Sequence, residues 1–221
     1  SPRRSVMKKL LRIGLPVALQ DGFIQVSFIL ITIIANRRGL TDAAAVGIVE
    51  KIIGFVFLIP SSMLSSVSAL GAQNIGAGKP ERAVGTLRYA ICIAVGLGLA
   101  VAGAVQLAAE QLVALFTPDA AVATAGGQYL RGYIWDCVFG GVQFSFSGYF
   151  CARGKSGLSF LHNALSILLV RIPGAYLTSL YFPQTLLPMG LASAAGSLFS
   201  SVVCLIAFAL LRRRDRLAEK N

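Results

Sequence analysis

Charged residues are scarce in this sequence, making up 13% of its 221 residues against 56% for hydrophobic residues. Soluble domains carry about a quarter of their residues as Asp, Glu, Lys or Arg. The mean hydropathy of +0.74 comes from long apolar runs, each sufficient to cross a bilayer core about 30 Å thick. The composition therefore excludes an ordinary soluble fold and predicts an all-α integral membrane protein.

Residues that could catalyse a reaction or bind a metal are also few. The chain has one histidine and four cysteines, with no C-x-x-C, H-E-x-x-H, G-x-S-x-G or paired-aspartate motif. Residues 71–80 are glycine-rich, but Pro80 stands where a phosphate-binding loop needs Ser or Thr. We therefore expect no enzyme, no metal site and no cofactor. The cysteines, which we interpret as small buried hydrophobic residues, are Cys92, Cys137, Cys151 and Cys204.

Acidic residues number only 9 against 20 basic ones, and the net charge is +11. The basic residues flank the apolar runs, as expected near a membrane surface, so we expect the lipid bilayer and not nucleic acid as a partner. The runs predict six transmembrane helices forming one domain over residues 1–221. They cover residues 13–34, 44–70, 84–108, 128–150, 157–181 and 186–211. Residues 116–127 predict a further short helix at the membrane surface.

Basic residues are distributed unequally between the two sides of this topology. If both termini lie on one side, that side carries 15 Lys and Arg and the other side 3. The asymmetry predicts that both termini are cytoplasmic. The 15 are Arg3, Arg4, Lys8, Lys9, Arg12, Lys79, Arg82, Arg88, Arg153, Lys155, Arg212, Arg213, Arg214, Arg216 and Lys220; the 3 are Arg37, Arg38 and Arg131.

Charged residues inside the apolar runs are costly unless they meet a partner or water, so they are the candidate functional residues. Counting helical rises places Asp136 and Arg171 at similar depth on consecutive helices, which predicts an ion pair. That pair is either a static clamp or part of a transport site. Asp21 has no basic residue at its depth and is a candidate protonatable or cation-binding carboxylate, or else a polar helix contact.

Five other polar residues have simpler structural interpretations. Glu50 and Lys51 lie near the start of the second run and are interpreted as an interfacial anchor. His162 is interpreted as an interfacial hydrogen-bonding residue, with a proton relay as the less favoured alternative. Asp21 is expected to be solvated by polar neighbours such as Gln20 and Gln25, or by a cavity.

Three stretches closely resemble the MATE family of multidrug and toxic compound extrusion transporters, in particular its DinF-like branch. They are GAQNIGAGKPERA (Gly71–Ala83), LRIGLPVALQ (Leu11–Gln20) and RIPGAY (Arg171–Tyr176). The resemblance implies the C-terminal six-helix lobe of a two-lobe transporter in the plasma membrane. It also implies alternating access, driven by H⁺ or Na⁺, that exports amphipathic organic cations. The expected partner is a missing N-terminal lobe or a second half-transporter.

In that family, acidic residues of the seventh and tenth helices are implicated in sodium coupling. Asp21 and Asp136 occupy those helices, and Ile24 and Gln25 match the acidic position of the seventh more closely. The expected coupling or substrate cavity comprises Asp21, Gln25, Asp136, Arg171, Tyr133 and Trp135, with further aromatic contacts from Phe23, Phe57 and Phe144. Pro16, Pro60 and Pro173 are the expected bending points. A lobe of a related lipid-linked oligosaccharide flippase and a non-transporting helical assembly remain the alternatives.

Overall fold

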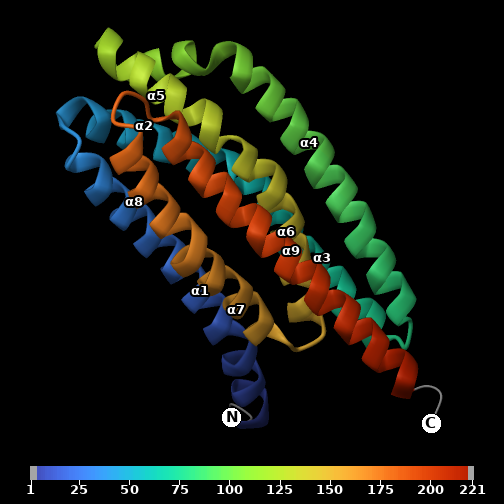
Figure 1. Cartoon of the computed structure of the whole chain (residues 1–221). Helices are drawn as coiled ribbons and strands as arrows, with labels where there is room; N and C mark the ends of the chain where they lie inside the picture. The colour runs from blue at the N-terminus through green and yellow to red at the C-terminus, as the bar shows by residue number, and fades with distance from the viewer. Residues whose placement is uncertain (1–3, 219–221) are drawn as a thin grey trace.

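The computed structural model describes residues 4–218, which fold into helices that pack side by side with both ends of the chain at the same end of the bundle (Figure 1). The predicted all-α class is confirmed. Two of the basic residues counted above, Arg3 and Lys220, lie outside the described part. The helices are α1 (Arg4–Asn36), α2 (Leu40–Val56), α3 (Leu58–Gly76), α4 (Pro80–Ala114), α5 (Ala120–Tyr133), α6 (Trp135–Ala152), α7 (Ser156–Ser166), the π-helical turn η1 (Ile167–Arg171), α8 (Ile172–Tyr181) and α9 (Leu187–Ala218).

Five helical segments in the described residues are long and apolar enough to cross a membrane, and they match five of the six predicted runs. The remaining run, residues 128–150, falls on α5 and α6. Because α6 packs against α3, α4 and α9, it meets protein on several sides and needs fewer apolar side chains. Six membrane crossings therefore stay a prediction. The five segments are Gly14–Asn36, Leu40–Gly76, Pro80–Ala114, Ser156–Tyr181 and Leu187–Leu217.

Two of the three predicted bending points coincide with interruptions of a helix. α2 and α3 are separated at Phe57, three residues before Pro60, because proline has no N–H to donate to the carbonyl four residues earlier. Pro173 follows the π-helical turn, in which the N–H of Ile172 donates to the carbonyl of Ile167. By contrast, Pro16 lies within α1, which continues uninterrupted from Arg4 to Asn36.

The predicted surface helix over residues 116–127 is the beginning of a longer one. Asp119 caps α5, its Oδ1 accepting hydrogen bonds from the N–H groups of Ala121 (2.8 Å) and Val122 (3.4 Å). α5 then continues to Tyr133 and buries one face against α4 and α9. α4 itself bends at Ala108, whose backbone leaves the helical region (φ −126°, ψ 18°).

Close contact between α5 and α9 depends on two glycines. A Cβ atom on Gly132 would collide with the carbonyl oxygen of Leu187, and one on Gly190 would collide with the carbonyl oxygen of Tyr129. Each glycine thus lets the other helix's backbone approach directly. This contact fixes the position of α5, which carries the buried Tyr133 described below.

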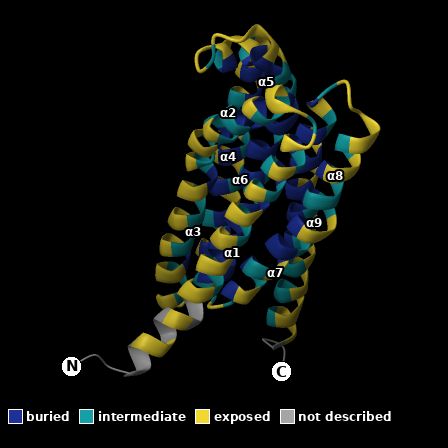
Figure 2. Cartoon of the chain, turned by 90° about the vertical axis from the view of Figure 1, so that its left-hand side faces the viewer, coloured by how far each residue is buried: buried dark blue, intermediate teal, exposed yellow. Residues whose placement is uncertain are grey.

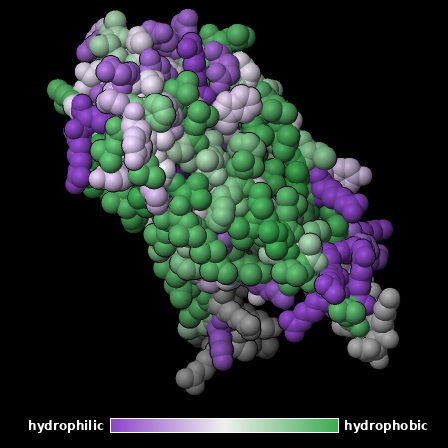
Figure 3. Space-filling view, in the orientation of Figure 1, coloured by the Kyte–Doolittle hydropathy of each residue, from purple (hydrophilic) through white to green (hydrophobic). Residues whose placement is uncertain are grey.

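The surface consists of a broad apolar band between two polar ends (Figure 3). Much of the band consists of exposed leucines, such as Leu97, Leu107 and Leu205. Burial increases toward the middle of the bundle, whereas much of α1 stays exposed (Figure 2). One exposed side chain is Cys92, so the interpretation of all four cysteines as buried is wrong for that residue.

Candidate functional site

A polar and aromatic stripe runs along one face of α1. Its members are spaced four, three and four residues apart, which places them on a single side of a helix. The facing side of α2 and α3 has the same periodicity and is opened by glycines. The α1 residues are Asp21, Gln25, Phe28 and Thr32, and those facing them are Gly47, Glu50, Gly54, Phe57 and Ser61.

Two cavities lie along this seam and together form one groove. One has a volume of about 310 Å³ and is bordered by Asp21, and the other has about 500 Å³ and is bordered by Glu50. They lie next to each other, since Gln25, Phe28 and Gly54 line both. We refer to this space as the α1–α2 groove. It has a carboxylate at each end and an aromatic side chain in the middle.

Glu50 is the residue of this groove whose importance the sequence interpretation underestimated. It is half-buried, ten residues after the start of α2, and its Oε2 accepts a hydrogen bond from the Thr32 hydroxyl (3.0 Å). Its other oxygen, Oε1, is buried without a hydrogen-bond partner among the described residues. Glu50 is therefore not the interfacial anchor we expected, although Lys51 beside it is exposed. The sequence feature that could have identified Glu50 as a site residue is its position as a carboxylate inside an apolar run.

The expected ion pair between Asp136 and Arg171 lies directly behind the groove. Nη2 of Arg171 is 2.6 Å from Oδ2 of Asp136 and also donates to the Tyr133 hydroxyl (2.8 Å). Both side chains are almost fully buried, at 5% and 0% exposure for Arg171 and Asp136. The guanidinium carbon is 5.7 Å from the centre of the Phe28 ring. Phe28 thus forms a wall between the groove and the ion pair.

The remaining predicted site residues take different positions. Tyr133 is buried against Arg171 and does not line the groove, and Trp135 is partly buried and packs against the hydrophobic core. Phe57 and Phe144 do line it, as an edge-to-face pair with ring centres 6.0 Å apart. Phe23 instead packs on Phe160 of α7 (5.3 Å). The groove therefore unites Asp21 and Gln25 from the predicted set, with Asp136 and Arg171 behind it.

His162 is buried and joins three helices. Its Nε2 lies 2.9 Å from the Ser147 hydroxyl on α6, and its Nδ1 lies 2.6 Å from the Ser200 hydroxyl on α9. The residue is a hydrogen-bonding one, as expected, and it lies inside the bundle; its position near the membrane interface stays a prediction. Gln20 is likewise buried, on the side of α1 that meets α7, so it does not share the stripe of Asp21.

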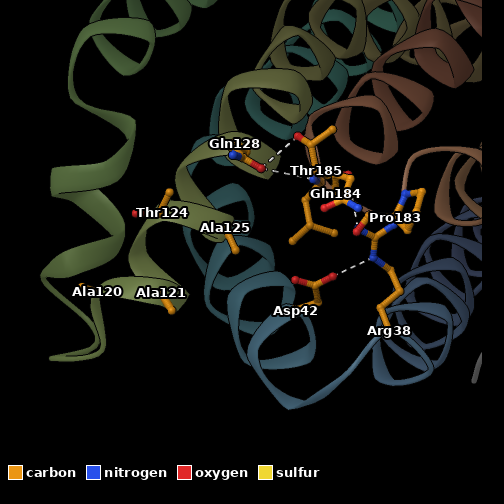
Figure 4. Close-up of a pocket in the computed structure, with 11 residues that line it drawn as sticks. Arg38, Asp42, Ala120, Ala121, Thr124, Ala125, Gln128, Pro183, Gln184 and Thr185 are labelled. Atoms are coloured by element: carbon orange, nitrogen blue, oxygen red, sulfur yellow. Dashed lines mark hydrogen bonds and ion pairs between the residues drawn. The ribbon is translucent and has the colours of Figure 1, made fainter.

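A separate cavity of about 460 Å³, drawn in Figure 4, lies at the end of the bundle opposite the chain termini (Figure 1). Arg38 dominates it, but every N–H group of this guanidinium is already engaged. Nε pairs with Asp42 (2.6 Å), Nη1 donates to the carbonyls of Ser179 and Phe182, and Nη2 donates to those of Pro183 and Thr185. Arg38 therefore joins the α1–α2 turn to the α8–α9 connection, and its guanidinium has no N–H donor left for a ligand.

Comparisons with known proteins all point to one family. The MatE family profile matches residues 16–177. The chain is 32% identical over 122 residues to the probable multidrug resistance protein NorM of Aromatoleum aromaticum, covering 55% of this chain and 26% of that protein. It is 26% identical over 192 residues to the probable multidrug resistance protein YpnP of Bacillus subtilis, covering 87% and 43%. The chain spans less than half the length of these relatives.

Solved structures agree on the fold. The chain superimposes over its whole length on 49% of a MATE protein crystallised in its straight conformation, with a TM-score of 0.87 and 22% identity. A MOP superfamily transporter from Pyrococcus furiosus gives a TM-score of 0.84 at 22% identity, again over 100% of this chain and 49% of that one. At this identity the likeness shows the fold alone.

Proposed function

This chain belongs to the MatE family of multi-pass membrane transporters, and on that premise we propose that it forms half of a cation-coupled exporter of amphipathic organic cations. Transport proceeds by alternating access in the plasma membrane, with H⁺ or Na⁺ as the coupling ion and no further cofactor. The observation that carries this proposal is the α1–α2 groove, which combines carboxylates with aromatic walls, the chemistry that suits an organic cation. Carboxylates that bind a cationic cargo can also bind H⁺ or Na⁺, so the same groups can exchange one for the other.

The exposed face around the groove supports a second helical body as partner. Asp21 and Gln25 are exposed on α1 within a segment apolar enough to span the membrane. Lipid tails cannot solvate a carboxylate or an amide, so this face requires water or protein in front of it. A missing N-terminal lobe or a second half-transporter would close the groove into a central cavity. Rocking of the two bodies would then expose the cavity to each side in turn.

Glu50→Gln provides the test of this function. In the complete two-lobe transporter, we expect efflux of a fluorescent organic cation to fall about tenfold, because a neutral amide no longer attracts the cargo or exchanges a proton. The fold should survive, since the amide oxygen of glutamine can still accept the hydrogen bond from Thr32. Efflux is measured in cells that lack their own exporters.

The matched control for that substitution is Glu110→Gln. Glu110 on α4 also accepts a hydrogen bond from a threonine, Thr124 (2.6 Å), but lies outside the groove. Its substitution should leave efflux unchanged. If the Glu50→Gln protein exported the cation at the wild-type rate when present at the same level, the groove would not be part of the transport path.

The proposed orientation places both termini in the cytoplasm. The turn at residues 77–79 then faces the cytoplasm, and the α8–α9 connection faces the outside. In a Cys92→Ser background, Ala77→Cys should react with a membrane-impermeant maleimide only after cells are opened, whereas Gln184→Cys should react in intact cells. Labelling in the reverse order would invert the topology. Both target residues are exposed.

A further inference from the structure

The two carboxylates of the α1–α2 groove are far apart. Asp21 belongs to the same stripe of α1 as Thr32, and Thr32 lies eleven residues after Asp21. The Thr32 hydroxyl donates a hydrogen bond to Glu50, so Thr32 marks the position of that carboxylate along α1. At 1.5 Å per residue, the carboxylates are about 16 Å apart along the helix axis. A compact cation with one charge can meet only one of them at a time.

The space between the carboxylates suits an apolar spacer. Phe28 lines both halves of the groove and presents one ring face to Arg171 behind it. Gly54 lies opposite, and a Cβ atom placed there would have no neighbouring atom within 4 Å. The middle of the groove is therefore open and is bordered by an aromatic ring. Gln25 is the polar side chain that shares this central part.

The carboxylates at both ends of the groove remain available to pair with a cationic ligand. Among the side chains that the structure describes, neither Asp21 nor Glu50 takes part in an ion pair, and Oε1 of Glu50 has no hydrogen-bond partner. The guanidinium behind the groove is already bound to Asp136 at 2.6 Å. Lys51 lines the Glu50 end, but its side chain is exposed and flexible enough to move toward solvent.

From this arrangement we infer that the groove selects elongated organic dications, with two cationic centres joined by an extended apolar spacer. One centre binds at Asp21, the other at Glu50, and the spacer lies along Phe28 and Gly54. The inference rests on the proposed function and specifies its substrate class. Binding both carboxylates at once gives the dication a second electrostatic contact without a second association step.

Equilibrium binding to the purified complete protein tests this inference with three probes. Dodecamethylene-bis(trimethylammonium) has a charge separation close to the estimated span, hexamethylene-bis(trimethylammonium) is too short to reach both ends, and dodecyltrimethylammonium, used below its micellar concentration, has one charge. We expect the long dication to bind about tenfold more tightly than either of the others. Equal affinity of the long dication and the monocation would overturn the inference.

Substitutions locate the two contacts. Asp21→Asn and Glu50→Gln should each abolish the preference for the long dication while leaving binding of the monocation at the other carboxylate, and Lys51→Gln should increase the preference. Gly54→Leu should block the groove, whereas Gly103→Leu, at an equally open and exposed glycine of α4, should not. A preference that survives both carboxylate substitutions would overturn the inference. Binding of neither the dications nor the monocation would instead count against the proposed function itself.

Discussion

Replacing Asp136 by Asn should lower the free energy of unfolding by about 3–5 kcal/mol, because it leaves the Arg171 guanidinium buried without its counter-ion. The side chains of this pair are 0% and 5% exposed, and the Tyr133 hydroxyl alone cannot neutralise the arginine. Arg171→Gln should cost a similar amount for the converse reason. The double substitution should cost less than the sum of the two, since no unpaired charge remains. Unfolding in mixed micelles provides the measurement.

A second ion pair in the same chain provides the control. Arg153 and Asp215 join the α6–α7 connection to α9 at the end near the termini, but their side chains are 22% and 38% exposed. Water can replace the partner there, so Asp215→Asn should cost no more than about 1 kcal/mol. If the costs of Asp136→Asn and Arg171→Gln simply added in the double variant, the two residues would not be coupled.

Arg38→Ala should destabilise the protein by about 3 kcal/mol, since charged hydrogen bonds to several carbonyl groups are lost together. The side chain is 8% exposed, and it ties the α1–α2 turn to the α8–α9 connection. Arg38→Lys should recover only part of the loss, because an ammonium is a point charge that cannot span the same set of acceptors.

Arg37, the exposed neighbour of Arg38, serves as the comparison. Arg37→Ala should change the free energy of unfolding by less than about 0.5 kcal/mol. In addition, protease sites introduced into the α8–α9 connection should be cut faster in Arg38→Ala than in the parent protein. Equal stability of the Arg38 and Arg37 variants would show that the clamp contributes nothing.

Features that depend on spacing along one helix were predictable from the sequence. Counting helical rises placed Asp136 and Arg171 at similar depth, and the structure pairs them. This succeeded even though the single helix expected over residues 128–150 is divided into α5, which begins at Ala120, and α6, which contains Asp136. The expectation succeeded because Asp136 and Arg171 are the unlike charges deepest in neighbouring apolar runs. Glu50 was misplaced for a related reason: α2 begins at Leu40, four residues before the apolar run, so Glu50 lies deeper than the run suggested.

Features that depend on backbone acceptors or on helix irregularity were not predictable. Four of the partners of Arg38 are carbonyl oxygens, which every residue has and no sequence pattern distinguishes. The π-helical turn before Ile172 is similarly hidden, because Pro173 shows only that a normal bond is missing and not how the helix compensates. The groove itself arises from two helices facing each other, and the sequence shows only each stripe.

The bend at Ala108 limits the length over which α4 continues along one axis. From Pro80 to the bend, α4 rises about 42 Å, which is close to the full thickness of a bilayer including its headgroup layers. Beyond the bend, the last turns carry Glu110 toward Thr124 of α5 and no longer continue the same axis. A bilayer much thinner than this would have to be met by tilting the bundle, at a cost of a fraction of a kcal/mol per Å of mismatch. The length of α4 before its bend is thus close to the thickness of a whole bilayer, and a thinner membrane would require the bundle to tilt.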